Sequence, residues 1–189
     1  MALKLTKVAS GIAFGDVSNA SIRNILTEIS KLLYGKFTIK QLKETLDYFD
    51  WKCPYTGKDL RNVIENGESG YATDHIYPQN KDFCGLNVKG NLVIVDSEAN
   101  KKKHDTDFET FMRDRRFDDL LGDSMVERER RIEKIKRFQQ DCNYNPELIK
   151  SIVSPMLTAR YEAVRDEQER TISDVIKQLN LAGISGIED

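Results

Sequence analysis

Residues 71–79, YATDHIYPQ, form an extended segment in which an aspartate stands directly before one of the two histidines of the chain. A second extended segment, NLVIVD at residues 91–96, follows after a loop at residues 76–90. Short runs of β-branched and aliphatic residues bounded by turn residues are typical of strands. Loops as long as this one are usually functional or disordered in compact domains. The pattern predicts two short strands joined by a long loop.

Helices are expected directly after the second strand. The segment DSEANKKKH has Asp96 or Ser97 as its N-cap, since either side chain can accept a hydrogen bond from the first helical turn. The next segment, TDFETFM, opens with a capping-box pattern of Thr106 and Glu109. Its apolar residues are expected in the core: Phe108, Phe111 and Met112. The middle of the chain thus has the order strand, loop, strand, helix.

The polar residues of this unit fall where a metal-dependent nuclease needs them. Asp74 and His75 are neighbours on one strand, so their side chains point to opposite faces. A carboxylate is a hard oxygen ligand for Mg²⁺ or Mn²⁺, and an imidazole with a pKa near neutrality suits a general base. Asn91 opens the second strand, and Asn100 lies about one turn into the following helix. The amide oxygen of Asn100 could complete a metal site there.

These segments resemble the HNH, or ββα-metal, endonuclease family. The residues that carry the resemblance are CPYTGKDL, YATDHIYPQ, GNLVIVDSEANKKKHD and TDFETFM. Their motifs are most similar to the HNH domain of RNA-guided CRISPR effector nucleases. The resemblance extends over residues 51–112 and does not include the helical flanks.

The resemblance implies a role for each polar residue of the unit. It implies that His75 is the general base that activates the attacking water, while Asp74 and Asn100 bind one divalent ion. It also implies that Asn91 orients His75 or its loop, and that Lys103 approaches the scissile phosphate. Products with 5′-phosphate ends are what the family implies.

Two positions depart from the family pattern. The third motif position is Asn100, with His104 four residues later, so it stays open which of the two meets the metal; the spacing from Asn91 favours Asn100. Many family members carry a zinc knuckle whose second cysteine is replaced here by Thr56. Structural zinc is therefore not expected, and Cys53 is expected to be a small buried residue.

Two helices are expected on the N-terminal side of the ββα unit. Apolar residues at helical spacing in SNASIRNILTEISKLLYG predict the first helix, with Ser18 or Asn19 as its N-cap and Gly35 at its end. The second helix, TIKQLKETLDYF, is expected to begin behind Thr38.

The C-terminal side is expected to be almost wholly helical. The charged segment SMVERERRIEKIKRFQQ carries a thin apolar stripe through Val126, Ile132 and Ile135. A longer helical segment follows and is interrupted by Pro155. Past this proline, several residues lie close to a heptad seam that includes Gln168: Leu157, Tyr161, Val164, Thr171, Val175 and Leu179. Packing within the chain is the commoner use of such a seam, and a homodimer is the alternative.

The composition limits the class of protein. The 189 residues include 29 Lys plus Arg and 31 Asp plus Glu, a formal net charge of −2. A nucleic-acid partner must therefore be bound by a local basic surface. Three widely spaced cysteines argue against a disulfide framework and a four-cysteine zinc site. No run approaches a transmembrane span, and residues 1–15 lack a signal-peptide pattern, so a cytoplasmic location is expected.

These observations predict an α+β, mainly helical protein: N-terminal helices at 1–50, an HNH core at 51–112 and C-terminal helices at 113–189. We expect an endonuclease that uses Mg²⁺ or Mn²⁺ on double-stranded DNA, in restriction, phage defence or a prophage. No specificity module is recognisable, so the flanking helices, a second copy or a protein partner is expected to supply specificity. The alternatives are a non-catalytic nucleic-acid- or partner-binding subunit and an RNA-directed nuclease, since a metal site contacts phosphate rather than sugar.

Overall fold

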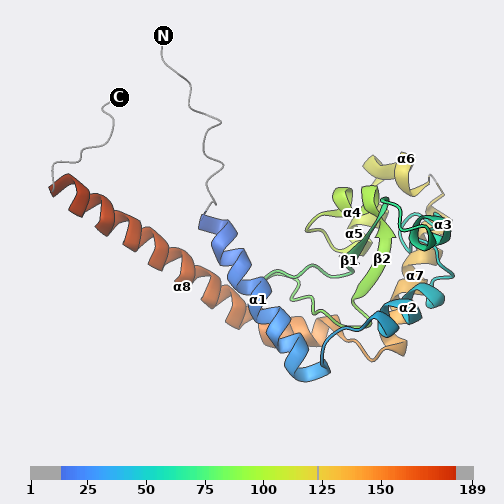
Figure 1. Ribbon diagram of the computed structural model, residues 1–189, viewed down its shortest axis with the longest axis horizontal. Helices are drawn as coiled ribbons and strands as arrows, with labels where there is room; N and C mark the ends of the chain where they lie inside the picture. Colours follow the sequence, from blue (N-terminus) through green and yellow to red (C-terminus); the bar gives the residue numbers. More distant parts are fainter. Residues whose placement is uncertain (1–13, 123, 182–189) are drawn as a thin grey trace, which may run out of the picture.

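The computed structural model describes residues 14–122 and 124–181 of the chain. Over these residues the protein is α+β and mainly helical, as the sequence predicts (Figure 1). The elements are α1 (Phe14–Tyr34), α2 (Ile39–Tyr48), α3 (Arg61–Glu65), β1 (Tyr71–His75), β2 (Leu92–Asp96), α4 (Ser97–Lys103), α5 (Phe108–Arg113), the 3-10 helix η1 (Arg115–Phe117), α6 (Asp118–Leu121), α7 (Met125–Asp141) and α8 (Pro146–Leu181). None of the described helices is long and apolar enough to cross a membrane.

Strands β1 and β2 form an antiparallel pair, and α4 follows β2 directly. The register places Asp74 opposite Val93 and His75 opposite Leu92. All of β2 is buried, while β1 alternates between exposed and more buried positions up to Asp74. The order of strand, loop, strand and helix predicted from the sequence is thus observed. It brings the Asp74–His75 pair next to the end of α4, where Lys103 contacts both residues.

The two helices after β2 are capped by aspartates. Asp96 is the N-cap of α4 and accepts a hydrogen bond from the backbone nitrogen of Ala99 at 3.4 Å. The N-cap of α5 is Asp107, which accepts from the backbone nitrogen of Thr110 at 3.0 Å. The prediction that Thr106 caps this helix is wrong, because Thr106 lies one residue too early and its backbone nitrogen bonds to α4 instead. As predicted, the apolar residues of α5 are buried: Phe108, Phe111 and Met112.

The N-terminal helices differ from the prediction only at their beginning. Helix α1 starts at Phe14, so the predicted N-caps Ser18 and Asn19 lie inside it, where Ser18 is fully buried. The helix ends before Gly35, whose φ of +76° suits a glycine beyond a helix end, as predicted. Helix α2 begins behind Thr38, also as predicted, and Thr38 caps it with a reciprocal capping box.

Helix α7 has a narrower apolar stripe than the sequence predicts. Ile132 and Ile135 are fully buried, but Val126 is 65% exposed because it faces solvent in the first helical turn. The fully buried side chain of that turn is Arg128, whose guanidinium pairs with Asp118 at 2.5 Å and donates to backbone carbonyls. The sequence pattern missed it because an arginine gives no apolar signal.

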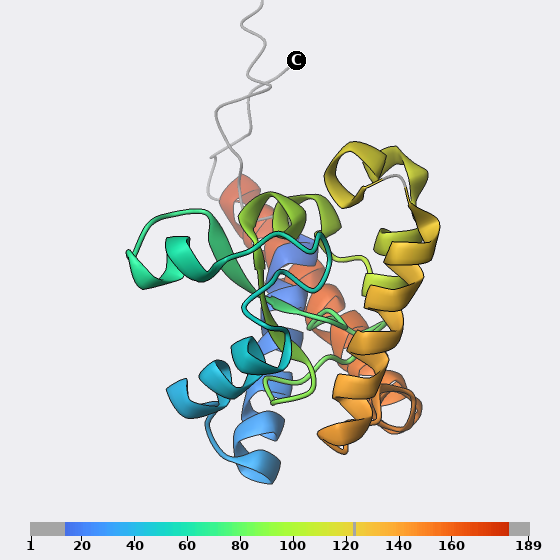
Figure 2. The same cartoon turned by 90° about the vertical axis from the view of Figure 1, so that its right-hand side faces the viewer.

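Helices α1 and α8 lie side by side, and α8 extends well beyond the compact part of the molecule (Figures 1 and 2). The predicted interruption at Pro155 is wrong, because α8 is continuous through it. A proline removes one helical hydrogen bond, and packing of the adjacent turn, with Leu157 buried against Ile22 and Leu26 of α1, compensates for that loss.

The predicted heptad seam of α8 divides into two parts. Leu157 and Val164 are buried and Tyr161 is half-buried, so this part packs within the chain. Thr171 and Val175 are exposed in the part that extends outward. Leu179, the last predicted seam position, lies outside the described side chains.

A separate hydrophobic cluster joins the long loop to these two helices. It includes Leu86 and Val88 of the loop, Ile22 and Leu26 of α1, and Leu157 of α8. The α1–α8 pair is therefore fixed directly against the loop that follows β1. This packing determines which side chains from outside the ββα unit reach the Asp74–His75 pair.

Candidate active site

The carboxylate of Asp74 is held by two buried side chains. Only 8% of Asp74 is exposed. The Tyr55 hydroxyl donates to its Oδ2 atom at 2.7 Å, and the Lys103 ammonium lies 3.0 Å from the same atom. Lys103 also donates to the backbone carbonyl of His75 at 2.7 Å. Tyr55 and Lys103 thus fix the position of Asp74 from behind.

The position of Lys103 differs from that of its two neighbours. Lys101 and Lys102 are exposed on α4, whereas Lys103 is 1% exposed. Burial lowers the pKa of Lys103 by more than the nearby Asp74 carboxylate raises it. Burial, and next the charge of Asp74, raises the pKa of Tyr55 well above its usual value, so this hydroxyl stays protonated as a donor.

The imidazole of His75 is positioned by Asn87 from the middle of the long loop. The Nε2 atom of His75 lies 2.6 Å from the amide oxygen of Asn87. Because an amide oxygen only accepts hydrogen bonds, Nε2 carries the proton and Nδ1 keeps its lone pair. Burial lowers the pKa of His75, and the Asn87 contact and the Asp74 charge oppose it. The ring is therefore neutral near pH 7 and can accept a proton at Nδ1.

Asn87 is in turn held by α1. Its amide nitrogen donates to the Thr27 hydroxyl at 3.1 Å, and its backbone nitrogen donates to the Ser30 hydroxyl at 2.9 Å. Gln79 also donates to Thr27, at 3.3 Å. The sequence did not predict the roles of Asn87 and Thr27. The only pattern that could have pointed to them is a polar residue within the long loop and another on a helix. Helix α1, outside residues 51–112, thus reaches the candidate site.

Asn91 contacts the ends of the loop rather than the imidazole. It is fully buried, and its Oδ1 atom accepts from the backbone nitrogen of Tyr77 at 2.8 Å. Its Nδ2 atom donates to the carbonyls of Tyr77 at 3.1 Å and Leu86 at 3.0 Å. These contacts fit the loop-orienting alternative of the two roles that the family resemblance implies for Asn91.

The two candidates for a second metal ligand lie in different surroundings. Asn100 is half-buried on α4, and its side chain makes no hydrogen bond to any residue in the described part of the chain. His104 follows the end of α4 and is exposed, with its Nδ1 atom 3.2 Å from the carboxylate of Asp105. A cleft of about 490 Å³ is lined by Asp74, His75, His104 and Asp105, and Asn100 is not among its lining residues.

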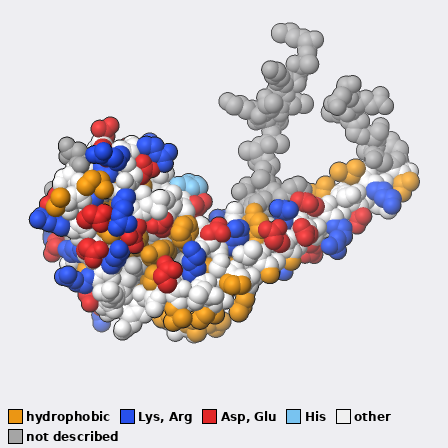
Figure 3. Space-filling model, turned by 180° about the vertical axis from the view of Figure 1, so that it is seen from behind, with side chains coloured by type: hydrophobic (Ala, Val, Ile, Leu, Met, Phe, Trp, Pro, Cys, Tyr) orange, Lys and Arg blue, Asp and Glu red, His pale blue; other side chains and the backbone are white. Residues whose placement is uncertain are grey.

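Part of the lining of this cleft comes from the helical flanks. Asn19 and Arg23 of α1 and Tyr161 of α8 line it, together with residues 78–83 of the loop. On the face shown in Figure 3, acidic and basic side chains are interspersed and no continuous basic surface forms. On this face a polyanion would meet local positive groups rather than a basic surface.

The donor set at Asp74 fits a hard divalent cation. Within residues 14–122 and 124–181, no group of three His, Cys, Asp or Glu side chains is arranged to hold a metal. Magnesium commonly takes one or two protein carboxylates and completes its shell with water and substrate phosphate. The Oδ1 atom of Asp74 has only a 3.4 Å contact with Lys103, so it has capacity for such an ion.

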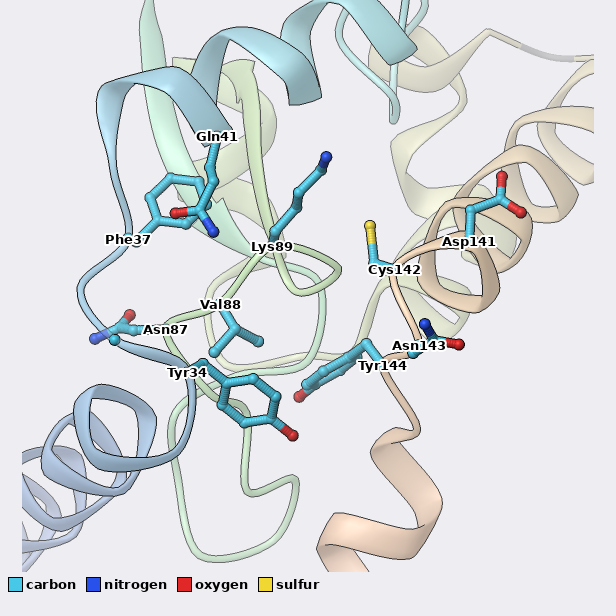
Figure 4. A pocket seen from close by; sticks show the side chains of 11 residues that line it. Tyr34, Phe37, Gln41, Asn87, Val88, Lys89, Asp141, Cys142, Asn143 and Tyr144 are labelled. Carbon is cyan, nitrogen blue, oxygen red and sulfur yellow. The ribbon is translucent and has the colours of Figure 1, made fainter.

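A second cavity, of about 250 Å³, lies between the α1–α2 connection and the α7–α8 connection (Figure 4). Tyr34, Phe37 and Tyr144 lie around it, and Lys89 on its rim pairs with Glu44 at 2.6 Å. None of the predicted catalytic or metal-binding residues lines this cavity. The cleft lined by Asp74 and His75 is therefore the candidate site.

Comparison with protein-family models finds no family that matches this chain, and comparison with curated proteins finds no match either. A function for the protein must therefore be argued from its motifs and from the geometry of the cleft.

Proposed function

We propose that the protein is a metal-dependent endonuclease of the HNH, or ββα-metal, type that hydrolyses phosphodiester bonds in DNA. The observation that carries the proposal is the environment of His75. Its ring lines the same cleft as the Asp74 carboxylate, and the 2.6 Å contact with Asn87 leaves Nδ1 free to take a proton. A neutral, oriented imidazole next to a hard oxygen ligand is the combination that water-dependent phosphodiester hydrolysis requires.

In this proposal His75 is the general base. Its Nδ1 atom takes a proton from a water molecule as the water oxygen bonds to phosphorus. The bond from phosphorus to the 3′ oxygen then breaks, and this oxygen takes a proton from solvent water, which leaves a 5′-phosphate on one product and a 3′-hydroxyl on the other. The amide oxygen of Asn87 stabilises the imidazolium through the proton on Nε2.

Asp74 and Asn100 are the proposed ligands of one Mg²⁺ or Mn²⁺ ion, where Asn100 is favoured by its spacing from Asn91 alone. His104 is the alternative to Asn100, and it lines the cleft together with Asp74. Such an ion, when bound, supplies Lewis-acid stabilisation of the charge on the scissile phosphate and the leaving oxygen. Lys103 acts on Asp74 rather than on the phosphate, because its ammonium is buried against that carboxylate. Tyr55 and Lys103 together keep the carboxylate oriented toward the cleft.

The proposed biological setting is restriction, phage defence or a prophage, with double-stranded DNA as the substrate in the cytoplasm. Sequence specificity would come from a protein partner or from a second copy of the chain. A homodimer through α8 is supported by three exposed apolar residues at three- and four-residue spacing in its outer part: Ile172, Val175 and Ile176.

The proposal is tested by incubating the full chain with supercoiled plasmid and with single-stranded RNA, in Mg²⁺, in Mn²⁺ and in EDTA. We expect nicked or linear DNA in either metal and none in EDTA. Cleavage of RNA but not of DNA would mean that the substrate is RNA. A folded protein that binds DNA and the metal but cuts neither substrate would instead be the non-catalytic binding subunit.

A further inference from the structure

One face of α1 forms part of the wall of the cleft. Asn19, Arg23 and Thr27 are spaced four residues apart, so they lie on the same face of the helix. Thr27 accepts hydrogen bonds from Asn87 and Gln79, which fixes this face toward the loop. Asn19 and Arg23 line the same cleft as His75. The contacts of Thr27, one helical turn from Arg23, therefore fix the side of α1 on which Arg23 lies.

Arg23 differs from the other cations of the cleft in having no acidic partner. Lys81 pairs with Asp82 at 2.7 Å, and His104 lies beside Asp105 at 3.2 Å. Behind the cleft, Lys103 pairs with Asp74. Arg23 is exposed, and its guanidinium makes no hydrogen bond or ion pair with any residue that the structure describes.

The acidic residues of the cleft oppose the binding of a polyanion, so a cation without an acidic partner is needed there. The carboxylates of Asp74, Asp82 and Asp105 all line the cleft and repel a polyanion. A guanidinium presents planar, forked donors that match two oxygens of a phosphate, and it stays charged at every physiological pH. Arg23 is therefore the side chain in this cleft that is best suited to bind a phosphate.

The backbone beneath Arg23 is held firmly in place. Ile22 and Leu26, on either side of it, are fully buried in the cluster that joins α1 to the loop and α8. Ser30 accepts a hydrogen bond from the backbone of Asn87 at 2.9 Å. Only the arginine side chain has to adjust to a ligand, which limits the entropy lost on binding.

We propose that Arg23 binds a backbone phosphate of the nucleic-acid substrate in the cleft that it lines together with His75. The substrate strand then lies along this cleft, past Arg23, His75 and His104. This inference rests on the proposed nuclease function and adds a substrate-binding residue from outside the ββα unit.

The test measures DNA binding and cleavage by an Arg23→Gln variant. Binding is measured in the His75→Ala background by the fluorescence anisotropy of a labelled DNA duplex, in Mg²⁺ and over a range of salt concentrations. Arg137→Gln is the matched control: Arg137 is also exposed, has no ion pair with a described residue, and lies on α7 beside a different cavity. Both substitutions remove one positive charge.

We expect Arg23→Gln to weaken binding by about tenfold and to reduce the slope of log affinity against log salt by about one. Arg137→Gln is expected to leave both values close to those of the parent. If the otherwise wild-type chain cuts DNA, and Arg23→Gln binds and cuts like Arg137→Gln, the inference is wrong while the nuclease function stands. If the His75→Ala protein does not bind DNA and the wild-type protein does not cut it, the nuclease proposal fails and this inference fails with it.

Discussion

The Nε2 atom of His75 lies 2.6 Å from the Oδ1 atom of Asn87, and this contact determines which nitrogen of the imidazole can accept a proton. Asn87 is not held by the ββα unit alone, because Thr27 and Ser30 of α1 accept its other hydrogen bonds. The orientation of the proposed base thus depends on a helix distant in sequence. The N-terminal flank is therefore part of the proposed active site.

Replacing Asn87 with leucine is expected to lower the cleavage rate about tenfold or more. Leucine is close to asparagine in size but cannot accept from Nε2, and a lost hydrogen bond of about 1.4 kcal/mol corresponds to a factor of ten. ¹⁵N shifts of the His75 ring would report the Nε2–H tautomer in the wild type and a mixture of tautomers in the variant. Asn66→Leu is the control, because Asn66 is exposed and contacts Glu68 away from the cleft. An unchanged tautomer and rate in Asn87→Leu would contradict the positioning role.

Replacing Lys103 with methionine is expected to destabilise the protein by about 3–5 kcal/mol in EDTA. The substitution leaves the Asp74 carboxylate buried without a counter-charge, and losing one partner of a buried pair is costly. The free energy of unfolding in urea measures the effect, with the exposed Lys101→Met as the control. Added Mn²⁺ is expected to restore more stability in Lys103→Met than in the wild type. Equal stability of the two variants in EDTA would show that the pair is unimportant.

Metal binding distinguishes the two candidates for the second ligand. Titration of the folded chain with Mn²⁺, followed by electron paramagnetic resonance, is expected to show one site that Asp74→Asn removes. Asn100→Ala is expected to weaken this site about tenfold or more, on the scale of altered metal coordination. His104→Ala is expected to leave it unchanged. The reverse result for the last two variants would assign the ligand to His104.

Local patterns in the sequence predicted the strands, α2 and α4 because their signals lie within one element. The β-branched and aliphatic run of β2, the beginning of α2 behind Thr38 and the N-cap at Asp96 each depend on residues close together in the chain. The beginnings of α1 and α5 differ from the prediction, because residues that can cap a helix stand next to one another there, Ser18 beside Asn19 and Thr106 beside Asp107. Pro155 predicts an interruption from the sequence alone, since the helix that packs beside it, α1, is distant in the chain.

The contacts that shape the site could not be predicted in the same way. Asn87 and Thr27 are 60 residues apart in the sequence, and neither belongs to the motif. The three lysines of α4 are indistinguishable in sequence, but the turn of the helix buries only Lys103. Tyr55 reaches Asp74 from a turn-rich segment whose composition predicts no such contact. These relationships arise from how the elements pack, which a local pattern does not encode.

The outer part of α8 is expected to mediate self-association. Val175 is 52% exposed, and an aspartate there would place a charge in a dimer interface without affecting the folded core. Sedimentation equilibrium is expected to give twice the mass of one chain for the wild type and the mass of one chain for Val175→Asp. Ile152→Asp, at an exposed position nearer the start of α8, is the control and should remain dimeric. A monomeric wild-type chain would contradict the dimer proposal.

The most direct test of the nuclease proposal is the rate of plasmid cleavage in Mn²⁺ by His75→Ala compared with the wild type. Near-UV circular dichroism and Mn²⁺ titration first establish that the variant is folded and still binds the metal. Loss of a general base predicts a rate about a hundred- to ten-thousand-fold lower, with metal binding intact. Metal-dependent cleavage at the wild-type rate by His75→Ala would contradict the assignment of His75 as the base.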